Sequence, residues 1–283
     1  MGKKIAFRIF IYTMMIVVGF VSIVPFLWLF ISSISTNNDL LSVPPKFIPS
    51  HPTFHRYYEL LFQSGKTEST KMFLVAMRNS LIVASVVTVI TLVLASLAAY
   101  AFARLNFPGR NPIQLSILAT RMLPALSTII PLYIFAKKFG LIDTKIILII
   151  LYLTFTLPFA IWMMIGFLKT IPKELEEAAM IDGATRMQTL LKVVFPLSAA
   201  GLTATAIFSF MLSWDEFFFA LIFTSSYAAK TIPVAISEFT GRHLIDYGMM
   251  CTGGVVASIP PILLTMWFRN YIVKGLTQGA VKG

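Results

Sequence analysis

The chain has 283 residues, of which 57% are hydrophobic and only 12% are charged, and its formal net charge is +11. A soluble domain carries about 25% charged residues, so this composition cannot supply the polar surface of a soluble fold. The Lys and Arg residues lie between long apolar blocks and form no single stripe, which argues against a nucleic-acid partner and favours an integral membrane protein.

The first apolar block follows three basic residues, Lys3, Lys4 and Arg8, as a secretory signal peptide would. The uncharged run at 9–38 is far longer than the apolar region of about 7–15 residues in a signal peptide, and no small-residue cleavage site stands out. We therefore expect this block to be a retained membrane span.

Six apolar blocks are long enough to cross a bilayer, which takes about 20 residues as a helix. They lie at about 9–34, 80–103, 113–136, 146–168, 197–223 and 252–272. This pattern predicts an all-α fold, a single transmembrane domain over 1–283 built as a polytopic bundle of six transmembrane helices. Its connections are an external loop at 35–79, a cytoplasmic coupling loop with a short helix at 169–196, and a cytoplasmic tail at 273–283.

The distribution of basic residues sets the orientation of the spans. With both termini inside, the inner segments carry twelve Lys and Arg residues and the outer segments carry ten. Cytoplasmic loops are enriched in Lys and Arg, so we expect a multi-pass protein of a bacterial or archaeal cytoplasmic membrane with both termini cytoplasmic. Prolines that predict kinks interrupt several spans: Pro25, Pro124, Pro131, Pro158, Pro260 and Pro261.

The external segment at 35–78 contains several prolines followed by Tyr57 and Tyr58, and we expect it to be only partly ordered. The sequence leaves two roles open for this segment, docking of a binding protein or a passive connection between spans. On the second span, Ala95, Ala99 and Ala103 recur every four residues, which favours close packing between helices.

Charged residues inside a span are costly and so are candidates for function. Arg121 either lines a solute pathway or bonds to helix carbonyls and a neighbour. Asp215 and Glu216 lie near the outer end of the fifth block, as surface residues, as a gate, or as a contact to the sugar or the binding protein. Four aromatic residues share one face of the fourth block, for packing or for stacking on a sugar: Tyr152, Phe155, Phe159 and Trp162.

The loop at 169–196 differs from the others because it is acidic and predicts two short helices. The first is expected to begin after Thr170 with Pro172 in its first turn, and Gly183 is expected to end it. Thr185 and Gln188 form a capping box for the second helix. Pro196 then marks the entry to the fifth span.

The first of these helices has a small apolar face. Leu175, Ala178, Ala179 and Asp182 lie on one side, and three glutamates lie near the N-terminus: Glu174, Glu176 and Glu177. Helices that lie on lipid carry Lys and Arg opposite large apolar residues, whereas this one carries glutamates and alanines. An alanine face fits into a groove on a partner protein.

Residues of this loop resemble a known signature. Glu177-Ala178-Ala179, then three residues, Gly183, nine residues and Val193-Val194-Phe195-Pro196 resemble the EAA motif of ATP-binding-cassette importer permeases, with Val193 and Phe195 in place of Ile and Leu. Tyr100-Ala101-Phe102-Ala103-Arg104, the following Phe107-Pro108-Gly109-Arg110 and the tail at 273–283 resemble the smaller permease subunit of the maltose-type carbohydrate family. The resemblance covers most of the chain and is weakest at 35–78.

The resemblance implies a heteromeric importer. Its other parts would be a second, larger permease subunit, two cytoplasmic ATPase subunits that bind ATP and Mg, and an extracytoplasmic binding protein that delivers the sugar; this chain would contact lipid and hold no cofactor. The residues implied to couple to the ATPase are Glu174, Glu177, Ala178, Ala179, Asp182 and Gly183. Those of the tail implied to reach the ATPase are Gly275, Leu276, Thr277, Gly279 and Lys282.

No catalytic or metal-binding group is expected in the chain. The fragment Gly65-Lys66-Thr67 lacks the first glycine of a P-loop, because Leu60 occupies that position. His51 and His55 have the spacing of a zinc pair, but Pro52 lies between them.

Several alternatives stay open. Within the importer class, the substrate could be a polyol, a glycerol phosphate or a uronate oligosaccharide. An ion-coupled secondary transporter would show inverted repeats and midplane carboxylates, which we do not see. A membrane enzyme would need a catalytic constellation, and the sequence shows none.

Overall fold

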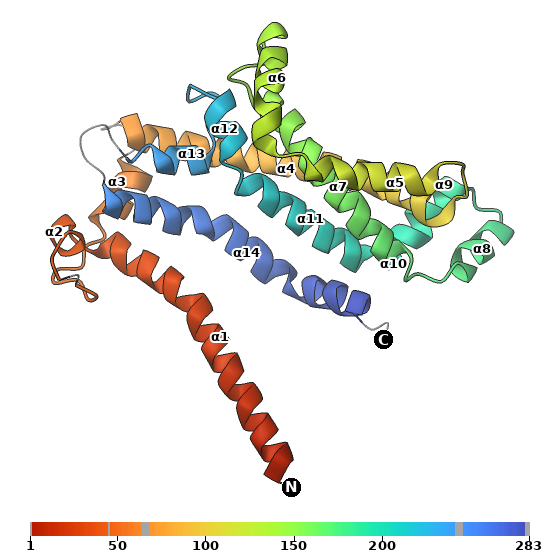
Figure 1. Ribbon diagram of the computed structural model, residues 1–283, viewed down its shortest axis with the longest axis horizontal. Helices are drawn as coiled ribbons and strands as arrows, with labels where there is room; N and C mark the ends of the chain where they lie inside the picture. The colour runs from red at the N-terminus through yellow and green to blue at the C-terminus, as the bar shows by residue number, and fades with distance from the viewer. Residues whose placement is uncertain (1, 45, 64–67, 241–245, 281–283) are drawn as a thin grey trace. The chain divides into compact units, whose positions relative to one another are not determined.

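The computed structural model describes residues 2–44, 46–63, 68–240 and 246–280, and these residues form helices without a β-strand (Figure 1). The first eight segments are α1 (Gly2–Ile34), α2 (Asn37–Leu40), α3 (His55–Phe62), α4 (Glu68–Arg104), α5 (Arg110–Ala119), the 3₁₀ turn η1 (Thr120–Met122), α6 (Ala125–Lys138) and α7 (Lys145–Leu168). The others are α8 (Glu174–Ile181), α9 (Arg186–Thr189), the π-helical turn η2 (Leu190–Val194), α10 (Phe195–Leu197), α11 (Ala199–Trp214), α12 (Phe218–Phe223), α13 (Ile232–Ser237) and α14 (Tyr247–Ala280). The all-α fold predicted from the sequence is confirmed.

Among the described residues, four helices are long and apolar enough to cross a membrane, and up to six spans result if each of two bent helix pairs counts as one. The four single helices are α1, α4, α7 and α14, which contain the first, second, fourth and sixth predicted blocks. The sixth runs on to Ala280, so the backbone of the predicted tail is largely helical.

The third and fifth predicted blocks are not continuous helices. The third is broken between α5 and α6, whose axes differ by 94°. Leu123 and Pro124 are both extended at the break, because the proline ring disfavours the helical conformation of the preceding residue. The proline at 124 therefore interrupts the helix as the sequence predicts.

The fifth block is divided at Asp215, where α11 ends and before α12 begins. The Glu216 carboxylate accepts hydrogen bonds from the backbone N–H groups of Phe219 (2.8 Å) and Ala220 (3.2 Å), so it caps α12 as a new helix. On its N-terminal side, α11 instead pairs with the helical segment Arg186–Leu197, at a bend of 79°.

The described residues fall into two compact units, one within 1–74 and 235–259 and the other within 75–234 and 260–283. The single transmembrane domain over 1–283 stays a prediction. The helices α4, α13 and α14 each continue from one unit into the other. The boundary therefore lies inside helices and has no linker or change of composition that could reveal it.

In the second unit, the alanine face of α4 is buried as predicted for a packing contact. Ala95 and Ala99 are completely buried and Ala103 nearly so. The hydroxyls of Thr91 on α4 and Thr156 on α7 are hydrogen-bonded at 2.9 Å in the same interior. Small side chains let the α4 backbone approach its neighbours closely.

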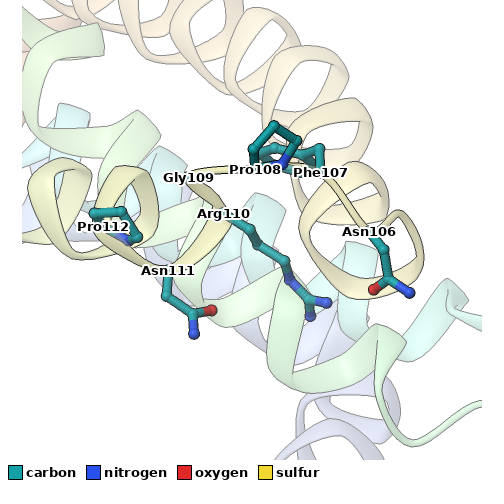
Figure 2. Close-up of a pocket in the computed structure, with 7 residues that line it drawn as sticks. All are labelled: Asn106, Phe107, Pro108, Gly109, Arg110, Asn111 and Pro112. Atoms are coloured by element: carbon teal, nitrogen blue, oxygen red, sulfur yellow. The ribbon is translucent and has the colours of Figure 1, made fainter.

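The loop that joins α4 to α5 lines a pocket of about 560 Å³ (Figure 2). Gly109 has φ +80°, the left-handed conformation that glycine adopts without strain, and it allows the tight turn into α5. Figure 2 shows the Arg110 side chain extending between Asn106 and Asn111. Its Nε is buried and has no hydrogen-bond partner within the part of the chain that the structure describes.

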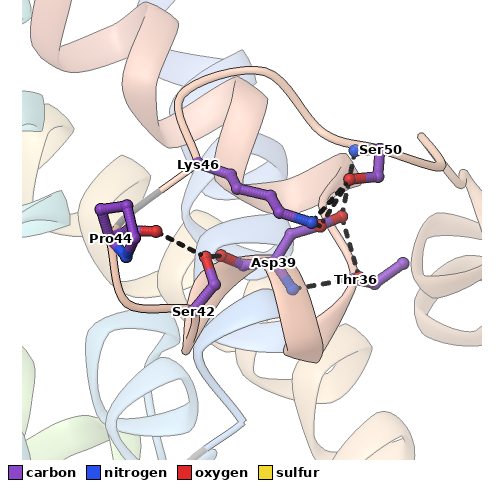
Figure 3. Close-up of polar contacts among 6 residues, drawn as sticks. All are labelled: Thr36, Asp39, Ser42, Pro44, Lys46 and Ser50. Atoms are coloured by element: carbon purple, nitrogen blue, oxygen red, sulfur yellow. Dashed lines mark hydrogen bonds and ion pairs between the residues drawn. The ribbon is translucent and has the colours of Figure 1, made fainter.

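In the first unit, the buried carboxylate of Asp39 organises the start of the external segment (Figure 3). It accepts hydrogen bonds from Thr36 Oγ1 (2.9 Å), Lys46 Nζ (3.1 Å), Ser50 N (3.1 Å) and Ser50 Oγ (2.9 Å). The carboxylate thus joins residues from both ends of the stretch at 36–50. This part of the segment is more regular than the sequence predicts, because one charged group satisfies several distant donors.

We predict that Asp39→Ala removes hydrogen-exchange protection from the described amides at 36–50 and that Glu59→Gln, in the same external segment, does not. Burial opposes ionisation of Asp39, but its bonds from Lys46, Ser50 and Thr36 outweigh burial and hold the pKa of the carboxyl well below 3.8. A depressed folded-state pKa gives stability that is complete above the unfolded value and is lost as pH falls toward the folded one. Both pH 7 and pH 5 lie above the unfolded value of 3.8, so in the native protein the protection of these amides, corrected for intrinsic exchange rates, should be equal at the two pH values. Native protection in Asp39→Ala would contradict this account.

Candidate functional site: the loop between α7 and α11

The helix α8 begins at Glu174, so Pro172 lies before it, and the prediction that the helix begins after Thr170 with Pro172 in its first turn is wrong. Lys173 O accepts the first bonds of the helix, from the backbone N–H groups of Glu176 (2.9 Å) and Glu177 (3.0 Å). Ile171 is buried, and its carbonyl accepts a bond from Arg104 instead of a helical N–H. All three glutamates lie in the first turn, where the helix dipole favours negative charge.

The C-terminus of α8 has the complete hydrogen-bond pattern of a Schellman motif. Ala184 N donates to Ala179 O (3.0 Å), and Gly183 N donates to Met180 O (3.1 Å). Gly183 has φ +90°, as predicted for the residue that ends this helix. The predicted capping box follows, in which Gln188 N donates to Thr185 Oγ1 (3.3 Å) and Thr185 N donates to Gln188 Oε1 (2.8 Å).

Most of α8 is at the surface. The residues that form what we call the exposed α8 face are Glu174, Glu177, Ala178, Ile181, Asp182 and Gly183. Among the predicted coupling residues only Ala179 is half-buried. The face combines three carboxylates with one large apolar side chain, Ile181, which is 85% exposed and belongs to none of the motifs in the sequence.

Glu176 is the exception, because it is the one buried residue of α8. Its Oε1 lies 2.5 Å from Arg104 Nε, and its Oε2 accepts a bond from the Tyr100 hydroxyl at 3.1 Å. Arg104 Nη2 also donates to Ile171 O at 2.8 Å. Removing one partner of such a buried ion pair costs about 3–5 kcal/mol, so the cluster of Tyr100, Arg104 and Glu176 fixes α8 strongly to the end of α4.

A surface helix thus follows a long apolar helix and exposes Glu177, Ala178 and Gly183 of the EAA motif, while Ala179 is half-buried. The family of binding-protein-dependent transport system inner membrane components has a model that matches residues 91–278. The chain belongs to this family.

Two relatives of this inner membrane component are sugar permeases by name. It is 36% identical to the trehalose/maltose transport system permease protein MalG of Thermococcus litoralis, over 100% of both chains. It is 40% identical to the trehalose transport system permease protein SugB of Mycobacterium tuberculosis, over 95% of both chains.

Two solved structures share the fold of this family member. One is a bacterial ABC transporter involved in the import of the acidic polysaccharide alginate, with TM-score 0.75 and 22% identity over 94% of this chain and 96% of that one. The other is a bacterial alginate ABC transporter in complex with an alginate pentasaccharide-bound periplasmic protein, with TM-score 0.68 and 15% identity over 94% of each chain. At these identities the likeness concerns the fold alone.

Arg121, a candidate pathway residue of this inner membrane component, lies in the 3₁₀ turn η1 at the break between α5 and α6. Its side chain is exposed, and its guanidinium carbon is 5.6 Å from the centroid of the Phe159 ring on α7. This distance is that of a cation–π contact. Phe159 also forms a T-shaped contact with Phe208 on α11, at a centroid distance of 5.9 Å.

The predicted aromatic face of α7 is divided between interior and surface. Tyr152 is completely buried, and its hydroxyl donates to Glu216 O at 3.5 Å, so its ring is enclosed by the core. Phe155 is stacked on Phe219 of α12 at 6.4 Å, whereas Trp162 is 54% exposed. Trp162 therefore has the most exposed side chain of the four aromatic residues.

The remaining predicted site residues lie outside α8 and outside the aromatic face of α7. Asp215 is exposed at the C-terminus of α11, and the carboxylate of Glu216 is occupied by capping α12. His55 Nε2 lies 3.3 Å from Glu59 Oε1, one helical turn away. Gly275, Leu276, Thr277 and Gly279 belong to the last turns of α14, while Lys282 and the fragment at 65–67 lie outside the described residues.

Proposed function

We propose that this chain is a permease subunit of an ATP-driven importer that moves a sugar or oligosaccharide across the cytoplasmic membrane by alternating access. The observation that carries the proposal is the exposed α8 face. It presents Glu177, Ala178 and Gly183 of the EAA motif on a short helix, and a buried ion pair joins that helix to the end of a 37-residue helix. Such a helix suits docking into a groove of a separate motor subunit.

The substrate class follows from the relatives. Both relatives compared above are at least 36% identical over nearly the whole chain, and both are named for trehalose or maltose transport. The alginate transporters resemble this chain at 22% identity or less, which supports a common fold and does not favour a uronate. We therefore favour a neutral sugar such as trehalose or maltose over a polyol, a glycerol phosphate or a uronate oligosaccharide.

The proposal includes the partners. Two cytoplasmic ATPase subunits would bind ATP and Mg, a larger permease subunit would complete the pathway, and an extracytoplasmic binding protein would deliver the sugar. This subunit would be non-catalytic. The family description as an inner membrane component of binding-protein-dependent transport supports a multi-pass location and these partner types. Both termini would be cytoplasmic, which places α8 on the side of the ATPase.

The mechanism follows from the connections of α8. Closure of the ATPase pair would move the exposed α8 face, and the attached spans would tilt and exchange outward for inward access. This is a rigid-body transition of packed helices. The C-terminal turns of α14, with Gly275, Leu276, Thr277 and Gly279, would reach toward the same ATPase subunits.

Uptake by the reconstituted complex tests the proposal. We predict that proteoliposomes containing both permease subunits and the ATPase accumulate labelled trehalose or maltose only when ATP is present on the ATPase side and binding protein on the other. Proton and sodium ionophores should leave the rate unchanged, because no ion gradient drives the step. Uptake that continues without ATP and stops with an ionophore would instead establish a secondary transporter.

A further inference from the structure

The attachment of α8 to the second unit is polar. Its large apolar side chains are substantially exposed, Leu175 at 45%, Met180 at 38% and Ile181 at 85%. Glu176 is its one buried residue. A helix without a buried apolar stripe has little hydrophobic attachment, so the position of α8 depends strongly on the bonds of this single carboxylate.

Those bonds lead to one place, the last turn of α4. Tyr100 and Arg104 are four residues apart and therefore share a face of that helix. They hold the two oxygens of Glu176 separately, and the side chains of Arg104 and Glu176 are only 7% and 5% exposed. Arg104 also bonds Ile171 O, so the end of α4 holds both α8 and the chain that enters it.

Directed bonds of this kind differ from apolar packing in what they transmit. Apolar surfaces can slide past each other, whereas two charge-assisted or hydroxyl bonds to the two oxygens of a carboxylate fix both direction and register. Exclusion from water keeps such a pair strong and poorly screened by salt. A displacement of α8 would therefore displace the end of α4 with it.

We propose that the pair of Arg104 and Glu176, with Tyr100 as a second donor, is the joint that passes motion of α8 to α4. Arg104 is a positioning residue in this role, since it acts through α8. The inference rests on the proposed function, because it assumes that an ATPase moves α8. The joint adds a non-covalent connection to the two covalent ones, in which the chain links α8 to α7 and to α9.

The test measures sugar molecules imported per ATP hydrolysed in the assembled complex. Glu176→Gln and Arg104→Ala should each lower this ratio about tenfold, within the range seen for residues along coupling paths. The double variant Arg104→Glu with Glu176→Arg should restore part of this ratio, because the ion pair is re-formed with reversed charge while Ile171 O loses its donor. A merely structural role would lower the yield of complex without changing the ratio per ATP.

Thr91→Val is the matched control, since it removes a buried bond from α4 that leads to α7 and not to α8. Its ratio should equal that of the native complex. An unchanged ratio in both Glu176→Gln and Arg104→Ala would overturn the proposal, as would a double variant no better than the single ones.

A distance measurement reports the joint itself. Spin labels at Leu175, which lies outside the exposed α8 face, and at Leu97, 45% and 40% exposed, can be placed in a Cys251→Ser background. The distance distribution should be narrow and equal with and without ATP, and Arg104→Ala should broaden it. A narrow distribution in Arg104→Ala would contradict the joint while leaving the importer intact, whereas failure of the native complex to couple ATP to uptake would contradict the proposed function.

Discussion

Replacing Gly183 with leucine is expected to abolish the stimulation of ATP hydrolysis by sugar-loaded binding protein while the subunit still inserts into the membrane. The residue has φ +90°, a conformation that costs a side chain roughly 1–2 kcal/mol. An added Cβ would meet nothing within 4 Å, so the new side chain projects outward beside Ile181 and Asp182. Bulk at that position should keep the exposed α8 face out of a groove on the ATPase.

Gly140→Leu is the control for this variant. Gly140 also follows a helix, at φ +66°, and an added Cβ there likewise meets nothing within 4 Å. The backbone bonds around it match those around Gly183, with Leu141 N donating to Ala136 O (2.9 Å) and Gly140 N to Lys137 O (3.1 Å). Both variants therefore place a side chain at a positive φ after a helix with the same hydrogen-bond pattern. Equal loss of stimulation in both would show that strain, and not docking, is responsible.

Glu177→Lys is expected to uncouple the complex to a similar degree. The Glu177 carboxylate is exposed and belongs to a face with Glu174 and Asp182, so a complementary partner should present positive charge. Reversing a charge at a desolvated interface costs about 2–5 kcal/mol, or more than tenfold in affinity of the ATPase.

Its control is Glu59→Lys, the same change of charge in the external segment. Co-purification of the ATPase at a series of salt concentrations measures the effect. Retention of the native amount of ATPase by Glu177→Lys would contradict a contact at this residue.

The sequence predicts the local structure of α8 well because the signals are local. Gly183 and the pair of Thr185 and Gln188 act on backbone groups within a few residues, and both form as expected. The four uninterrupted spans can also be predicted from the sequence, since length and composition are sufficient to recognise a membrane-spanning helix.

The burial of Glu176 could not be predicted in the same way. Its neighbours Glu174 and Glu177 are exposed, and the composition of the helix does not distinguish the three glutamates. Arg104 is 72 residues away along the chain, so only the tertiary fold shows that the two side chains meet. The division of the fifth block at Asp215 could not be predicted for the same reason. In the sequence, Glu216 is only a charged residue in an apolar block, and the structure shows that its carboxylate caps α12.

The most direct test of the central claim is photo-cross-linking from position 181 in the assembled complex. A benzophenone thiol probe at Ile181→Cys, in a Cys251→Ser background, should capture the nucleotide-hydrolysing subunit. The same probe at Met122→Cys, 83% exposed at the α5–α6 break, should not. Capture of phospholipid alone from position 181 would show that α8 lies on the bilayer and would contradict its role as the contact with a motor protein.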